Sequence, residues 1–584
     1  MTDCNLIAAL FTTGLVLSCV ALTLTSSDNK VSFEALLARL SASLIARGEP
    51  VFPDQTLRLD GSALQSLEND ITDSGDIPRS ILGDGSALGG PQVQTKYGVL
   101  KGLTVDKAHI FYGVPFADPP VGERRWKPPT PPTPWKEVRD ATFPRPGCMQ
   151  TCSGPIYNEC PTEVSEDCLY LNIFVPLDVD FKSPLLTPLP VMVWIHGGDF
   201  IAGSASKPLY DGRFIANFTR TVVVNLEYRL GAFGFLVSGK NPKASAVGNY
   251  GLLDQQAALL WVQQNIAVFG GDPSRVTIFG ESAGAQSVCL HLMLQSSQPL
   301  FQQAVCQSLP FSIPLKTSGS AVTGLLVFSR HEARKLGKHF AKLANCSAKD
   351  WACLQALTSQ EVLAAQVKAG SKIVNPFRFL ELFESWGPYI DGELIKEQSI
   401  TAFQKGHWQK DKPVLLGTTS EEGVIFVYGV FTKPVSALEC TVYTTAIFKQ
   451  HALRILHKYI PLYQDADRRS MLSQIVTDYV FLCPSRRAAR AAAGGGGAAW
   501  LYVFDHAAAD PGVVGPAPLL RARLPRGGAP LPTPFCREQR PVSWPRYSGA
   551  SAGGWALMNL TLASHAQPGF RDQLCDFWDK LGVY

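Results

Sequence analysis

The sequence has few charged residues and almost no excess of either sign. Of its 584 residues only 17% are Asp, Glu, Lys or Arg, and 53 basic residues against 49 acidic ones leave a net charge of +4. A charge this small argues against a nucleic-acid partner. Apolar residues make up 46% of the chain, so the composition excludes a disordered or fibrous protein and predicts a large buried core.

A stretch near the amino terminus lacks charge entirely. Residues 6–24 form a mostly apolar run, preceded by an acidic rather than a basic flank. The run is longer than the apolar region of a signal peptide, about 7–15 residues, and close to the lower limit for a membrane span, about 17. We therefore expect residues 1–25 to be a cleaved signal peptide or a retained signal anchor of a type II membrane protein, and both alternatives stay open.

The next segment, residues 26–90, has little that predicts a folded structure. It contains one amphipathic candidate helix, residues 33–46, followed by a tract rich in Ser, Asp and Gly. We expect a poorly ordered stalk or pro-segment here. From Val93 onward apolar and polar residues alternate around Gly and Pro turns, a pattern typical of antiparallel strands. The sequence therefore predicts one large globular domain over residues 91–584.

The most informative stretch is FGGDPSRVTIFGESAG, residues 269–284. A short strand, Val276 to Phe279, runs directly into a G-x-S-x-G sequence centred on Ser282, and a helix-compatible segment follows. This order is typical of a nucleophile elbow, in which a tight turn exposes a serine at the edge of a sheet. Side chains at the flanking positions would collide, which explains glycine at 280 and at 284.

Strand-like and helix-like segments alternate along the rest of the chain. Continuous apolar runs of strand length, typical of strands buried on both faces, occupy residues 191–195, 222–228, 414–417 and 500–504. Residues 252–269 have the apolar spacing of an amphipathic helix. This alternation favours parallel strand pairing and predicts an α/β fold.

Three further motifs accompany the elbow: YGVPFADPPVG at residues 112–122, EDCLYLN at 166–172 and HGG at 196–198. Together these motifs resemble the type-B carboxylesterase/lipase family, which includes cholinesterases and related adhesion proteins, from about residue 90 to the end of the chain. The resemblance implies the α/β-hydrolase fold, a large, mostly parallel sheet with helices on both faces. It also implies hydrolysis of a small-molecule carboxylic ester through an acyl-enzyme on Ser282, with no metal or cofactor.

The resemblance assigns further site residues. Backbone N–H groups of Gly198, Asp199 and Ala283 would form the oxyanion hole, and Glu422 would be the carboxylate that orients the catalytic base. The family usually has Gly or Ala at the position of Asp199. A carboxylate there would lie beside the developing negative charge and hinder the chemistry unless it turns away.

The catalytic histidine expected from the resemblance is missing. The family carries a His-Gly pair in the loop after the late strand, but residues 507–534 contain no histidine and are rich in Pro, Gly, Ala and Arg. This segment is atypical and has the character of a local replacement. His506 and His565 are the remaining candidates for the base, and we expect neither to reach Ser282.

Two functions therefore remain open. The first is a carboxylic ester hydrolase, impaired by the missing histidine motif. The second is a catalytically weak or inactive binding protein that uses the same fold to hold a protein partner, as the adhesion relatives do. Retention of Ser282 and Glu422 favours hydrolysis, whereas loss of the His-Gly pair favours binding.

Cysteines and glycosylation sequons indicate an oxidising compartment, hence a secreted or lumenal protein. Fourteen cysteines are present, and sequons begin at Asn217, Asn345 and Asn559. By resemblance, the expected disulfides are Cys148 with Cys168, Cys346 with Cys353 and Cys483 with Cys575; Cys152 and Cys160 are a further candidate pair. No tryptophan lies between Cys148 and Cys168, where cholinesterases bind quaternary ammonium, which argues against choline esters as substrates.

Overall fold

The structure is a computed structural model that describes residues 90–151, 160–182, 186–317, 332–370, 385–505, 544–549, 554–561 and 564–583. The chain divides into two units, Met1–Leu88 and Gly89–Tyr584, and every described residue belongs to the second. The expected leader, the expected stalk, the atypical segment 507–534 and His506 all lie outside the described residues.

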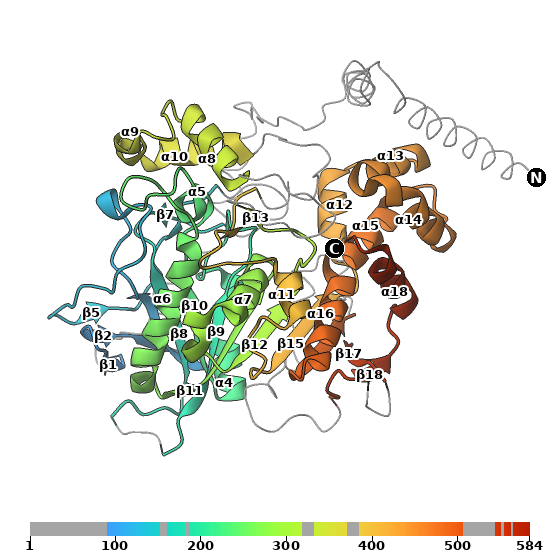
Figure 1. The fold of residues 1–584 in the computed structure, drawn as a ribbon. Helices are drawn as coiled ribbons and strands as arrows, with labels where there is room; N and C mark the ends of the chain where they lie inside the picture. The colour runs from blue at the N-terminus through green and yellow to red at the C-terminus, as the bar shows by residue number, and fades with distance from the viewer. Residues whose placement is uncertain are drawn as a thin grey trace, which may run out of the picture. The chain divides into compact units, whose positions relative to one another are not determined.

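An eleven-stranded sheet forms the centre of this unit (Figure 1). Its strands, in spatial order, are β18 (His565–Pro568), β17 (Ala556–Leu560), β16 (Ala499–Phe504), β15 (Val414–Thr419), β12 (Gln303–Gln307), β11 (Gly271–Glu281), β9 (Leu189–Ile195), β10 (Val222–Leu226), β8 (Tyr170–Pro176), β4 (Ala108–Pro115) and β3 (Leu103–Val105).

The middle of the sheet is parallel. Strands β10, β9, β11, β12, β15, β16 and β17 pair in parallel, whereas β8, β4 and β3 at one edge and β18 at the other are antiparallel to their neighbours. The predicted mostly parallel sheet is confirmed. Because parallel strands point the same way, the loops that follow them emerge along one edge, called here the carboxyl edge.

Short strands form three smaller sheets. These are β1 (Gln92–Gln94), β2 (Val99–Lys101) and β5 (Arg139–Asp140) in the first, β13 (Lys316–Thr317) and β14 (Tyr389–Ile390) in the second, and β6 (Gly147–Cys148) and β7 (Val164–Ser165) in the third. The antiparallel pairing of β1 with β2 and of β3 with β4 agrees with the strands expected at the start of the domain.

Helices pack on the two faces of the sheet and beyond its carboxyl edge. They are α4 (Arg213–Thr219), α5 (Gly231–Phe235), α6 (Tyr250–Asn265), α7 (Ala283–Met293), α8 (Glu332–Leu343), α9 (Trp351–Ala356), α10 (Ser359–Gly370), α11 (Ser399–Lys405), α12 (Val424–Val430), α13 (Ala437–Phe448), α14 (Ala452–Tyr459), α15 (Arg469–Val476), α16 (Cys483–Gly494) and α18 (Asp572–Leu581). Helices α6, α7 and α16 share one buried cluster with the sheet, and α4 packs on the opposite face. None of the described helices is both long and apolar enough to cross a membrane.

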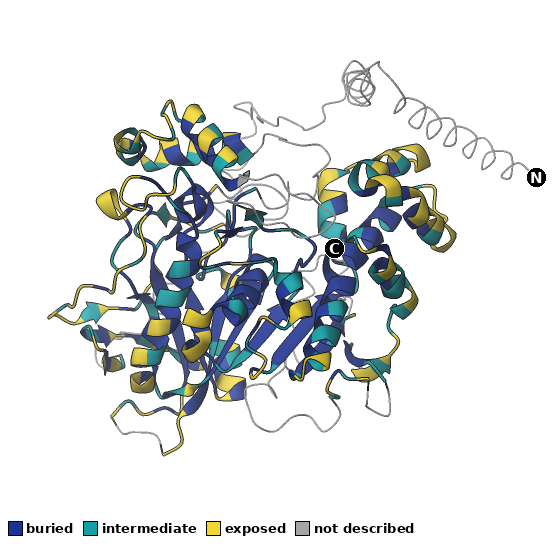
Figure 2. Ribbon diagram, viewed as in Figure 1, coloured by how far each residue is buried: buried dark blue, intermediate teal, exposed yellow. Residues whose placement is uncertain are grey.

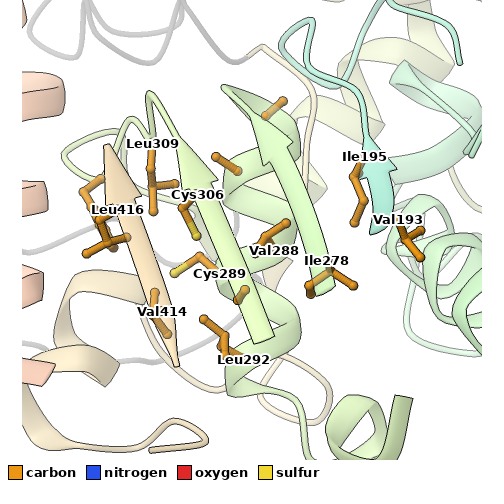
Figure 3. Close-up of a cluster of buried hydrophobic side chains, with 14 of the residues drawn as sticks. Val193, Ile195, Ile278, Val288, Cys289, Leu292, Cys306, Leu309, Val414 and Leu416 are labelled. Carbon is orange, nitrogen blue, oxygen red and sulfur yellow. The ribbon is translucent and has the colours of Figure 1, made fainter. Parts of the chain in front are cut away.

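The core lies between α7 and the central strands. Alternate residues of β9, β11, β12 and β15, including Val193, Ile278 and Leu416, meet Val288 and Leu292 of α7 (Figure 3). The central strands are buried on both faces (Figure 2), because residues of the other parity, such as Trp194 and Phe279, enter a second cluster. Burial on both faces explains the continuous apolar runs in the sequence.

Candidate active site

Polar side chains follow several neighbouring strands at the carboxyl edge. His196 follows β9, Ser282 follows β11, Ser308 follows β12, and Glu422 lies three residues beyond β15. Register ties these ends together, since Glu281 of β11 pairs with Gln307 of β12, and Gln307 pairs with Gly417 of β15. The sheet thus brings together residues that are up to 226 positions apart in the sequence.

Ser282 occupies the strained turn expected of a nucleophile elbow. Its φ of 55° and ψ of −120° lie in a region that residues other than glycine rarely adopt, at a typical cost of about 1–3 kcal/mol. Its N–H donates to the carbonyl of Gln307 at 3.0 Å. A Cβ at Gly284 would lie 2.0 Å from the carbonyl oxygen of Ile195, and one at Gly280 would lie 2.7 Å from the same atom. The two elbow glycines are therefore required by contact with β9.

The HGG turn lies directly against the elbow. A Cβ at Gly197 would come 3.1 Å from the Cβ of Ser282 and 2.7 Å from Oε2 of Glu281, so only glycine fits there. Beneath the turn, His196 is fully buried, and its carbonyl accepts a hydrogen bond from the Tyr228 hydroxyl at 2.9 Å. The His196 ring stacks on the Tyr228 ring and supports the backbone of the turn.

The three expected oxyanion-hole residues lie on the two sides of Ser282. Gly198 and Asp199 have φ values of 111° and 54°, and Ala283 is the first residue of α7. Within the described part of the chain, no acceptor is found for the N–H groups of Gly198 and Ala283. Donors of this kind next to a nucleophile are what an oxyanion needs.

Glu422 is buried and held from two sides. It is 2% exposed, and its Oε1 accepts hydrogen bonds from Ser308 Oγ at 2.6 Å and from the N–H of Thr419 at 2.7 Å. The next residue must be glycine, because a Cβ at Gly423 would lie 2.0 Å from the carbonyl oxygen of Ser473. β15 is two strands from β11, a lateral separation of about 10 Å. Ser282 and Glu422 therefore follow strands that are separated by one intervening strand, β12.

Ser308 was not predicted as a site residue from the sequence. Its hydrogen bond fixes the orientation of the Glu422 carboxylate, and its own φ is 52°. The signal that could have located it is its place directly after β12, because a polar residue that ends a buried strand faces the same edge as Ser282.

Glu281 carries the most informative pKa shift of the site. Burial, with further contributions from the carboxylates of Glu422 and Asp199, raises the pKa of Glu281 to about 8, and Lys207 opposes the shift. Near neutral pH the Glu281 side chain is therefore mostly protonated. The Asp199 carboxylate contributes to the raised pKa of Glu281, and its expected effect on the oxyanion stays a prediction.

Among the hydrogen bonds between described residues, none joins a histidine to Ser282 or to Glu422. Eight of the ten histidines lie in the described residues; His331 and His506 do not. His565 lies on β18, five strands from β11, a lateral distance of about 24 Å. Among the described residues, the Ser282 hydroxyl has no hydrogen-bond partner. The geometry thus agrees with the expectation that His565 does not reach the nucleophile.

Three disulfides join described cysteines: Cys148 with Cys168, Cys346 with Cys353 and Cys483 with Cys575. These are the three pairs that the family resemblance implies. Cys160 is also disulfide-bonded, whereas Cys152, its expected partner, lies outside the described residues. Cys289, Cys306 and Cys440 are free and buried.

The three sequons differ in exposure. Asn217 and Asn345 are exposed, but Asn559 is 7% exposed within β17, and its Nδ2 donates to Oε1 of Gln567 at 3.0 Å. A glycan would attach at Nδ2, the atom that Asn559 uses in this hydrogen bond. Glycosylation of the three sequons stays a prediction.

The chain is similar in sequence to a family of known proteins. The model of the carboxylesterase family matches residues 89–522. The chain is 34% identical to acetylcholinesterase of Bungarus fasciatus over 571 residues, which cover 86% of this chain and 88% of that protein. It is 38% identical to the crystal protein of Dictyostelium discoideum over 401 residues, 68% of each chain. It is also 34% identical to cholinesterase of Mus musculus over 449 residues, 71% of this chain and 69% of the relative.

Proposed function

Because this chain belongs to the carboxylesterase family and shares its α/β-hydrolase fold, we propose that it hydrolyses small-molecule carboxylic esters with Ser282 as the nucleophile. In the first step the Ser282 hydroxyl attacks the ester carbonyl and forms a tetrahedral oxyanion. The N–H groups of Gly198, Asp199 and Ala283 donate to that oxyanion. Collapse breaks the ester C–O bond, and the departing alcohol takes up the proton lost by the serine hydroxyl. Water then attacks the acyl-serine, releases the carboxylic acid and returns the proton to Ser282.

The observation that supports this proposal is the strained backbone of Ser282 against the HGG turn. A φ of 55° holds the serine at the carboxyl edge, and the close approach of Gly197 brings the turn within contact distance of the nucleophile. Strain of this kind persists only where the surrounding structure enforces it, and it is common at catalytic residues. Each donor of this kind contributes roughly 2.7–4 kcal/mol to an acyl-transfer transition state.

Turnover by this chain is proposed to be slow, because no histidine is identified as the base. We assign Glu422 the role of orienting an imidazole. His565 is about 24 Å away along the sheet, and the sequence has no histidine in 507–534. His506 comes two residues after the end of β16 in the sequence, and we expect it not to act as the base. Hydrolysis then depends on the oxyanion hole and on substrate binding, which leave roughly 10³–10⁴-fold over water when a triad is broken.

A fluorophosphonate probe tests the nucleophile without requiring turnover. We expect the probe to label the folded wild-type chain and not Ser282→Ala. Equal labelling of the two proteins would contradict the assignment of Ser282.

The base is tested by steady-state hydrolysis of a p-nitrophenyl ester. We expect a low rate in the wild type that His506→Ala and His565→Ala leave unchanged, with Ser282→Ala as the background control. A high wild-type rate that either histidine substitution abolishes would identify that histidine as the base and refute the proposal of slow turnover.

A second candidate is a binding protein with the same fold and no significant turnover. The observation that favours it is the Ser282 hydroxyl, which has no hydrogen-bond partner among the described residues, together with the missing His-Gly pair. This candidate predicts that Ser282 neither reacts with the probe nor supports hydrolysis. In that case a protein partner would replace the ester as the ligand.

We also propose that the protein matures in an oxidising compartment and is secreted or lumenal. The support is the set of three disulfides among described cysteines, which persist where thiols are not kept reduced. Whether residues 6–24 are removed or anchor the chain as a type II membrane protein is decided by amino-terminal sequencing of the mature product.

A further inference from the structure

Helix α4 carries two exposed aromatic side chains that stack on each other at the surface. Phe214 is 49% exposed and Phe218 is 56% exposed, and their rings stack with centroids 5.5 Å apart and planes 8° apart. The two adjacent phenyl rings form a small contiguous apolar patch, and covering it would remove apolar surface from water. The rest of the helix is anchored, since Ala216 and Thr219 are buried against the sheet.

Asn217 lies on the same side of α4 as this pair. Residues 214, 217 and 218 are spaced i, i+3 and i+4, which places their side chains next to one another on one helix face. Asn217 is exposed, and its side chain makes no hydrogen bond to any described residue. It also begins the sequon Asn217-Phe218-Thr219. The Asn217 side-chain amide and the two phenyl rings therefore lie next to one another on the surface of α4.

We propose that Asn217 carries an N-linked glycan whose first N-acetylglucosamine covers the Phe214–Phe218 pair. The sugar presents C–H groups on one side of its ring, and these suit the electron-rich face of an aromatic ring. Its hydroxyl groups then face water in place of the phenyl rings. The glycan has a structural role as the cover of this apolar pair, beyond its general effect on solubility.

The modification is an ordinary group transfer. A new bond forms between Nδ2 of Asn217 and C1 of the sugar, while the bond from C1 to the phosphate oxygen of a lipid-pyrophosphate oligosaccharide donor breaks. One proton leaves the amide nitrogen, and the pyrophosphate departs with the electron pair. No oxidant or reductant is needed.

The position of α4 keeps such a glycan away from the candidate active site. α4 ends at Thr219 and leads into β10, which begins at Val222, so Asn217 lies toward the amino end of that strand. Ser282 lies at the carboxyl edge, and the five residues of β10 separate the two ends by about 17 Å. In Figure 1, α4 lies near the lower end of the sheet, whereas α12 and α13 lie at the upper right. The glycan thus leaves the approach to Ser282 open.

The surroundings of the pair favour a covalently attached sugar over a large docked protein. Charged pairs flank it on both sides, Arg213 with Asp211 and Arg220 with Asp178. The apolar area is limited to two rings, far less than a stable protein interface buries. A sugar that is already tethered to the same helix needs only a small contact, because its effective concentration at the rings is high.

The test uses the full chain made in cells that attach N-glycans. Mass spectrometry of peptides after release with peptide-N-glycosidase should find Asn217 occupied and Asn559 unoccupied. The folded wild type should then be deglycosylated under native conditions and compared with Asn217→Gln. Both should bind more of a hydrophobic dye than the glycosylated protein, because the two rings are then exposed.

Asn345→Gln is the matched control, since it removes an exposed sequon that has no stacked pair of exposed aromatics on its face, and it should leave dye binding unchanged. The triple variant Asn217→Gln, Phe214→Ser, Phe218→Ser should return dye binding to the glycosylated level. An unmodified Asn217 would overturn the proposal. So would equal dye binding before and after native deglycosylation, because the glycan would then not cover the two rings.

Discussion

Replacing Glu281 by glutamine should change how the stability of the protein depends on pH. The Glu281 carboxyl lies against the HGG turn, with Gly197 so close that a Cβ there would be 2.7 Å from Oε2. Burial and the carboxylates of Glu422 and Asp199 raise its pKa from 4.5 to about 8. The folded protein therefore keeps this proton over a pH range in which the unfolded chain has lost it.

The sign of the effect follows from this difference. Because the folded-state pKa is raised, the stabilising contribution is fully present below the unfolded pKa of 4.5 and is lost as pH rises toward about 8. The slope is at most about 1.4 kcal/mol per pH unit. Between pH 5 and pH 7 the upper bound is about 3 kcal/mol, and because part of Glu281 is exposed we expect about 1–2 kcal/mol.

Urea or thermal unfolding of the wild type and Glu281→Gln at pH 5, 6, 7 and 8 measures this difference. Glutamine does not titrate, so the variant should gain stability relative to the wild type as pH rises, with the smallest difference at pH 5. Ser282→Ala, which keeps the carboxyl, should follow the wild type. If the wild type and Glu281→Gln change in parallel from pH 5 to pH 8, Glu281 is not held protonated, and the inferred environment of the elbow is wrong.

Three further substitutions test the site. Asp199→Gly removes a carboxylate near the developing oxyanion and should speed fluorophosphonate labelling of the nucleophile by roughly tenfold, or about 1.4 kcal/mol; an unchanged rate would mean that the carboxylate turns away. Ser308→Ala removes a 2.6 Å donor from Glu422 and should lower the free energy of unfolding by about 1–3 kcal/mol, whereas no loss would mean that another donor replaces it. Gly284→Ala would bring a Cβ to 2.0 Å from a carbonyl oxygen and should fail to give folded protein. Gly429→Ala, where a Cβ would have no atom within 4 Å, is the control and should fold normally. Similar yields of the two variants would contradict the steric account.

Much of the architecture could be predicted because the central strands have a strong local signal. The apolar runs at 191–195, 276–279 and 414–417 all fall within parallel strands of the sheet. The helix predicted over 252–269 is observed as α6 and a short 3-10 turn, Ile266–Phe269. The observed ends of the helices and strands differ from the predicted ends by a few residues, because hydrogen bonding and not hydropathy determines where an element ends.

The parts of the site that escaped prediction depend on contacts between distant segments. Ser308 follows its strand without any motif, and its role exists only because β12 lies between β11 and β15. The burial of Asn559 likewise depends on Gln567 of the neighbouring strand, whereas a sequon is recognised from three residues alone. The pKa of Glu281 reflects Glu422 and Asp199, each brought close by the fold. None of these relationships has a signal in local sequence.

The crowding around the elbow glycines affects how the G-x-S-x-G sequence is interpreted across evolution. A Cβ at Gly284 would meet the carbonyl of Ile195, and one at Gly280 would meet the backbone of Gly284 and the same carbonyl. These backbone atoms are present whatever chemistry the edge performs. A descendant that abandoned hydrolysis would still unfold if it lost either glycine, so selection for folding alone would preserve most of the motif. The two glycines therefore reflect a packing requirement of the fold. Their presence identifies proteins that share the fold, and does not separate active enzymes from inactive descendants.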